Sequence, residues 1–203
     1  MLKPVTNITI EQQGSGRSLV LFFDFVTQWE FANNWEDLSA KGKVIFPKNI
    51  YAHEVTTGKR YPLFGVNRNS NIGGFNSSPI IMRADKIKIE SQYIFWDKDV
   101  SEYETVKKTI AEGYISDVKV GLPVEVSFED NMYLLKKTPM SNKVYKKTQT
   151  IESILSEALL SVNSKFNTSF KVGEASQTNV TWDAGLLSSE NETIAEFLAK
   201  LKR

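Results

Sequence analysis

The sequence predicts a mainly β protein that ends in a small α+β part. Between residues 5 and 128, apolar and polar residues alternate in short runs separated by turn signals, which is typical of antiparallel strands. After residue 149, apolar residues recur every three or four positions, which is the spacing of an amphipathic helix. We therefore expect an antiparallel β-barrel or sandwich over residues 1–138 and a small α+β module over residues 139–203.

Six runs in the first part are predicted to be strands. Gly14 and Gly16 follow the first run as a flexible turn, and Pro47 stops the third, because proline has no N–H to give to a ladder. The last two runs form a hairpin through Gly121-Leu122-Pro123. The six runs are residues 5–12, 19–29, 43–46, 83–92, 110–118 and 124–128.

Residues 51–79 are predicted to be a loop insertion that projects from the barrel. The segment is polar and rich in Gly, Asn and Ser, and a loop of this length in a compact domain is usually functional. Its exposed side chains, together with the aromatic cluster after the fourth strand, are candidates for contacts between subunits. The interface candidates are Arg68, Asn69, Phe75 and Trp96.

The last 65 residues are predicted to hold two helices and two short strands. Thr150 is suited to cap a helix over residues 150–162, and residues 192–202 carry a second apolar stripe. The strands are expected at residues 170–172 and 180–182. The chain ends with the second helix, so we expect this module to be part of a longer one.

Composition argues against most kinds of chemistry. The 203 residues include no cysteine and one histidine, His53, and the net charge is +1. Thiolate chemistry is therefore excluded, and a lone histidine cannot assemble a metal site by itself. No apolar run approaches the ~20 residues of a membrane span. We expect no cofactor, no metal and no membrane span.

Glu129 and Asp130 form an acidic pair that could suggest catalysis. Adjacent residues on a strand point to opposite faces, so we expect that the two carboxylates cannot flank one bond as glycosidase carboxylates do. A structural role is predicted instead, either as a cap of the turn before Met132 or in a pair with Lys136 or Lys137. No catalytic residue is assigned.

A cluster of lysines follows the hairpin. Their charges could contact DNA phosphates inside a channel, although a solvated linker explains the same run. The channel-facing candidates are Lys136, Lys137, Lys143 and Lys146.

Several motifs occur in an order that resembles bacteriophage tail hub proteins, relatives of the late-control D family. The most informative runs from Gly113-Tyr-Ile-Ser116 through Pro123 to Lys137. Upstream of it, Ala84-Asp-Lys-Ile-Lys-Ile89 is similar to a "G-D-x-V-x-I" strand of the family, with Ala84 in place of the usual glycine. Further similar segments are Trp35–Leu38, Gly42–Asn49, Thr150–Leu160 and Thr193–Lys202.

The resemblance implies a tail-tube-like β-barrel and no catalytic residues. It implies a structural component of the phage tail, forming the hub or baseplate ring at the tail tip that continues the tube channel for DNA delivery. Expected partners are copies of the chain, as a trimer or else a hexamer, the tail tube, tape measure and baseplate proteins, and DNA in transient passage. The expected location is the virion, after assembly in the host bacterial cytoplasm. The alternatives are a hub of a contractile injection system, a tail-associated hydrolase and a monomeric binding module.

Overall fold

The computed structural model describes residues 2–14, 16–33, 38–47, 49–63, 80–95, 103–104, 106–145, 149–173 and 187–202. The chain divides into two compact units, Met1–Asn131 and Met132–Arg203. The predicted boundary lay at residue 138. The units divide earlier because the short helix α1 (Met132–Lys136) packs against helices of the second unit.

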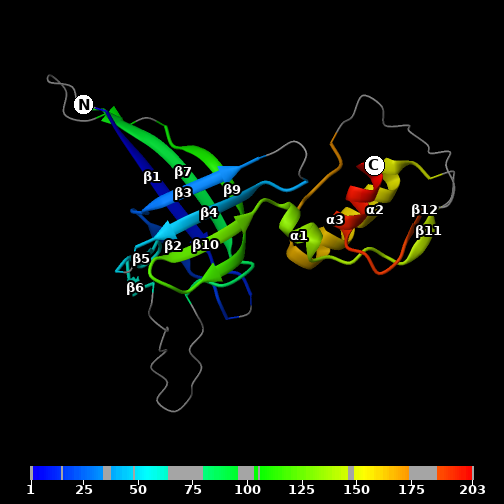
Figure 1. Ribbon diagram of the computed structural model, residues 1–203, viewed down its shortest axis with the longest axis horizontal. Coiled ribbons are helices and arrows are strands. Elements are labelled where there is room, and N and C mark those ends of the chain that lie inside the picture. Colours follow the sequence, from blue (N-terminus) through cyan, green and yellow to red (C-terminus); the bar gives the residue numbers. More distant parts are fainter. Residues whose placement is uncertain are drawn as a thin grey trace, which may run out of the picture. The chain divides into compact units, whose positions relative to one another are not determined.

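The first unit is one large antiparallel sheet, so the prediction of a mainly β protein is confirmed (Figure 1). Its strands follow the order β3-β4-β10-β9-β7-β1-β2-β5-β6, with β8 beside β7. Among the described residues no pairing joins β3 to β6, so the sheet has open edges. The strands are β1 (Leu2–Glu11), β2 (Val20–Phe23), β3 (Gln28–Ala32), β4 (Lys41–Phe46), β5 (Tyr51–Glu54), β6 (Arg60–Pro62), β7 (Lys86–Phe95), β8 (Tyr103–Glu104), β9 (Lys108–Lys119) and β10 (Val124–Glu129).

One face of this sheet encloses the hydrophobic core. Alternate residues of its strands are buried, as period-2 geometry requires. Four strands separate β2 from β4 in the sheet order, yet the rings of Phe23 and Phe46 lie 4.7 Å apart. The sheet therefore curls around its core. Fully buried members include Ile8, Ile10, Leu21, Phe23, Val44, Phe46, Ile87, Ile89, Ile115 and Val126.

The structure corrects two parts of the predicted strand pattern. The run 19–29 is not one strand: it breaks at residues 24–27 into β2 and β3. The segment 51–79 is not a loop throughout, because β5 and β6 form a hairpin at its start. Residues 64–79 lie outside the described part.

The fourth predicted strand begins later than expected, at Lys86 rather than at residue 83. Ala84 has a φ of +71°, the left-handed conformation that favours glycine. Its N–H donates to the Ile115 carbonyl at 2.8 Å, and the Ile115 N–H donates to the Asp85 carbonyl at 2.9 Å. The ladder with β9 therefore holds this turn in place.

The second unit combines α1, β11 (Lys143–Tyr145), α2 (Ile151–Phe166), β12 (Leu187–Ser189) and α3 (Ile194–Lys202). Both predicted helices are confirmed, and Thr150 is the N-cap of α2, accepting from the Ser153 N–H at 3.2 Å. The α2 helix ends at Phe166, four residues later than predicted, and Asn167 caps it in a left-handed conformation. Residues 170–172 were predicted to be a strand, but they do not form one. The other predicted strand, residues 180–182, lies outside the described part.

A reciprocal capping box begins α3. The Thr193 N–H donates to Glu196 Oε2 at 2.7 Å, and the Glu196 N–H donates to Thr193 Oγ1 at 3.3 Å. These bonds from the Thr193 backbone and hydroxyl to the carboxylate hold the pKa of Glu196 below its usual value. The cap therefore favours the ionised carboxylate.

We expect Glu196→Ala to lower the free energy of unfolding at neutral pH. Because the folded-state pKa is depressed, this contribution is fully present above the unfolded-state pKa and is lost as pH falls through the folded-state pKa. The gap between wild type and variant should therefore narrow in acid, measured by urea unfolding across pH. A gap that stayed constant, or widened, at low pH would contradict the role of the charge.

Candidate functional site

Strand β3 is an open edge of the sheet. Among the described residues it pairs with β4 alone. Trp29 and Phe31 pack against the core, whereas Gln28, Glu30 and Ala32 are exposed. The strand thus presents a row of backbone N–H and C=O groups on which another strand can pair.

Other stretches of the sheet also lack a neighbour on one side among the described residues. Strand β8 pairs with β7 alone, and residues 108–113 of β9 pair with β7 but not with β10. The first half of β1 and strand β6 each contain proline. Strand β1 pairs with β7 along all ten of its residues and with β2 along residues 8–11 alone, which leaves its first half, including Pro4, without β2 beside it. Strand β6 ends at Pro62. Proline cannot donate to a ladder and blunts a sheet edge. At the two ends of the sheet order, β6 contains proline and β3 does not, so β3 is the end strand better suited to accept another strand.

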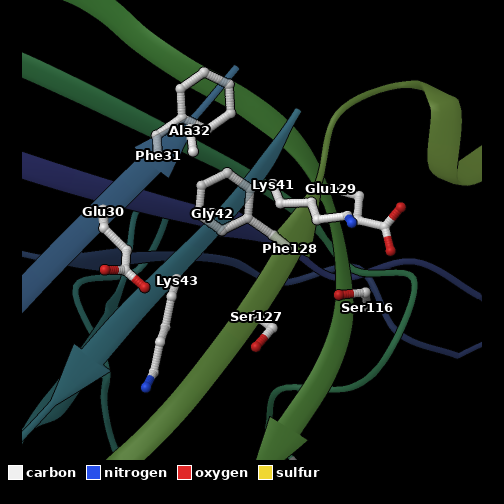
Figure 2. Close-up of a pocket in the computed structure, with 10 residues that line it drawn as sticks. All are labelled: Glu30, Phe31, Ala32, Lys41, Gly42, Lys43, Ser116, Ser127, Phe128 and Glu129. Carbon is white, nitrogen blue, oxygen red and sulfur yellow. The ribbon is translucent and has the colours of Figure 1, made fainter. Parts of the chain in front are cut away.

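A glycine between two aromatic rings fixes the position of β3. Gly42 of β4 lies opposite both Phe31 of β3 and Phe128 of β10. A Cβ on Gly42 would lie 2.1 Å from the Phe128 ring. The two rings are parallel within 3° with centroids 5.9 Å apart (Figure 2). The glycine therefore lets both rings pack across the middle strand.

A cleft of about 380 Å³ lies over β3, β4 and β10. In Figure 2 the side chains of Lys43 and Ser127 point away from the two phenylalanine rings. Lys43 Nζ pairs with Glu125 Oε2 at 2.9 Å, and this bond holds the pKa of the Glu125 carboxyl below its usual value. The cleft itself is lined by charged side chains of both signs. Its lining residues are Glu30, Phe31, Ala32, Lys41, Gly42, Lys43, Ser116, Ser127, Phe128 and Glu129.

The prediction that Glu129 and Asp130 point to opposite faces is wrong. Both carboxylates converge on the buried Ser39 hydroxyl, which lies 3.1 Å from Glu129 Oε2 and 3.2 Å from Asp130 Oδ1. Asp130 follows the last residue of β10, so strand alternation no longer applies to it. It also accepts from the Ala40 N–H at 3.0 Å and donates its own N–H to the Ala40 carbonyl. The acidic pair thus fastens the chain before β4 to the end of β10.

A buried ion pair joins the β1–β2 turn to the segment before β7. Arg17 binds Asp85 through both terminal nitrogens, with Nη2 2.8 Å from Oδ2. Asp85 also accepts from the N–H groups of Gln13 and Met82. This network fixes the chain where it enters β7.

Most sequence-predicted site residues lie outside the described part of the chain: Arg68, Asn69, Phe75, Trp96 and Lys146. The other lysines belong to the second unit. Lys143 pairs with Glu157 at 2.5 Å, and Lys137 Nζ lies 5.5 Å from the Tyr133 ring centroid, while Lys136 is exposed. Lys143 is therefore engaged within its own unit, and a channel-facing role of these lysines stays a prediction.

Sequence reasoning missed the open edge β3 and the Arg17–Asp85 pair. The run 19–29 was interpreted as one strand, which hid the edge. No local signal links Arg17 to Asp85, because the two are 68 positions apart.

No protein-family model matches the chain, and no curated protein matches its sequence. Within the described ranges, no group of three or more His, Cys, Asp or Glu side chains is placed to hold a metal ion. The helices that the structure describes are too short or too polar to cross a bilayer.

Proposed function

We propose that this chain is a structural subunit of a bacteriophage tail. In this proposal it forms the hub or baseplate ring at the tail tip and continues the tube channel through which DNA is delivered. The order of the hub-like motifs in the sequence supports the family assignment. The curled antiparallel sheet is compatible with a tail-tube-like barrel. A hub of a contractile injection system would use the same architecture.

The observation that carries the ring proposal is the open edge at β3. An edge strand without proline keeps all its backbone N–H donors and can therefore pair with another strand, and β3 carries one exposed charge, on Glu30. A two-fold dimer centred on Glu30 would place two like charges opposite each other, which destabilises strand pairing. A contact between β3 and a different surface of the next copy avoids this repulsion. Such head-to-tail contacts form a ring where the rotation between copies closes, and an open filament where it does not.

The mass and shape of the full-length protein test this proposal. We expect sedimentation of the wild type to show one closed oligomer, a trimer or a hexamer, and negative-stain images to show rings. Glu30→Pro should give monomers, because it adds to β3 the block that β6, at the other end of the sheet order, already has. Arg60→Pro on the edge strand β6 is the matched control and should leave the ring intact.

Circular dichroism establishes that each variant is folded. If Glu30→Pro unfolds, Ala32→Lys provides a second test, because it puts a charge on the edge without removing an N–H. A wild type that stays monomeric at every concentration would contradict the ring. A Glu30→Pro ring as stable as the Arg60→Pro ring would exclude β3 as the contact.

We also propose that the acidic pair is structural and that the chain is not a hydrolase. Glu129→Gln with Asp130→Asn should lower the free energy of unfolding by about 1–3 kcal/mol, because their bonds to Ser39 and Ala40 weaken. Urea unfolding measures this loss, and a peptidoglycan-release assay measures activity. Cleavage by the wild type that disappears in a folded, ring-forming double variant would favour the tail-associated hydrolase.

A further inference from the structure

Tyr145 places a polar group in the interior of the second unit. It is the last residue of β11 and is 3% exposed, with its ring 5.6 Å from the Phe197 ring. Its hydroxyl oxygen is buried and has no hydrogen-bond partner among the residues that the structure describes. Buried hydroxyls almost always bond to protein or to ordered water, because an unmade bond costs the full desolvation of the group.

A small cavity lies beside this residue. Its volume is about 10 Å³, close to the smallest space that can hold one water molecule. Tyr145 lines it from β11, and Glu157 and Ser161 line it from α2. The lining also includes the apolar residues Pro139, Met140, Ala158 and Ile194, and both Glu157 and Ser161 are exposed. The polar side chains from β11 and α2 supply hydrogen-bonding groups of the kind that a bound water needs.

We propose that this cavity is a binding site for one ordered water molecule. The Tyr145 hydroxyl donates to the water, and the water donates to a side-chain oxygen of Glu157 or Ser161. The Tyr145 hydroxyl then gains a hydrogen-bond partner, which the described side chains and backbone do not supply. The bridge connects the β11–β12 ribbon to α2, alongside the direct Lys143–Glu157 bond at 2.5 Å.

The two states of the cavity predict effects of opposite sign for Tyr145→Phe. If the water is bound, the variant loses the hydrogen bond between the Tyr145 hydroxyl and the water, and the water loses one of its partners. The folding equilibrium constant should then fall about tenfold. If the cavity is dry, the variant removes an unsatisfied hydroxyl, so the constant should stay or rise. Tyr51→Phe, at an exposed position, is the matched control for the loss of a phenol hydroxyl.

The experiment is urea unfolding of the full chain for wild type, Tyr145→Phe, Ser161→Ala, the double variant and Tyr51→Phe. A high-resolution crystal structure of the wild type should place a water within hydrogen-bond distance of Tyr145 Oη. A fall in the constant for Tyr145→Phe beyond that of the control, with this water present, supports the proposal. An unchanged or raised constant, or a dry cavity, overturns it, whether or not the protein forms a ring.

Discussion

Asp85→Asn should lower the free energy of unfolding by about 3 kcal/mol. The substitution keeps the size of the side chain and removes its charge. Asp85 is fully buried and the Arg17 side chain is 12% exposed, so the guanidinium would stay in the interior without its counter-charge. Breaking a buried pair in this way costs far more than the pair contributes, because desolvation of the remaining charge is no longer offset.

A second Arg–Asp pair of the same unit provides the matched control. Arg83 binds Asp117 with side chains that are 70% and 37% exposed, and this bond holds the pKa of Asp117 below its usual value. Water can replace either partner there, so Asp117→Asn should change stability little. Urea unfolding of the two variants compares the free energy lost when a buried ion pair is broken with that lost when an exposed pair is broken. Equal effects of Asp85→Asn and Asp117→Asn would show that the Arg17–Asp85 pair does not depend on its burial.

The elements that sequence reasoning predicted well are those whose signal is local. The hairpin of β9 and β10 follows from strict alternation around residues 121–123, and α2 follows from its apolar spacing and Thr150. The signal for the hairpin lies in two strands and the turn that joins them. The signal for α2 lies in the helix and its N-cap. The local preferences and the fold therefore agree.

The break between β2 and β3 could not be predicted, because residues 24–27 contain no glycine or proline. Phe25 and Val26 continue the apolar run, yet Phe25 is 60% exposed in the structure. Whether a strand lies at the edge of a sheet also cannot be read from the residues of that strand, because it depends on which other strands pair with it. The convergence of Glu129 and Asp130 on Ser39 likewise requires the pairing of β4 with β10.

Gly113 is the described glycine of the first unit at which an added Cβ would lie closest to backbone atoms. It lies in β9 next to Tyr114, which pairs with Glu129 at the end of β10. A Cβ on Gly113 would lie 2.0 Å from the Glu129 carbonyl oxygen and 3.0 Å from the Asp130 Cα. These are backbone atoms, so no side-chain rotation can relieve the overlap. The end of β10 would have to move away from β9, and the bonds of the acidic pair to Ser39 and Ala40 would move with it.

Gly113→Ala should therefore lower the free energy of unfolding by about 3 kcal/mol, the upper end of the usual cost of overpacking. Gly173→Ala is the matched control, because its added Cβ would have no atom within 4 Å and its φ is not positive. That variant should be as stable as wild type or slightly more so, since alanine restricts the unfolded chain. Urea unfolding measures both. A Gly113→Ala protein as stable as Gly173→Ala would mean that β9 and β10 separate at little cost, and the close approach of the two strands would then not hold the acidic pair in place.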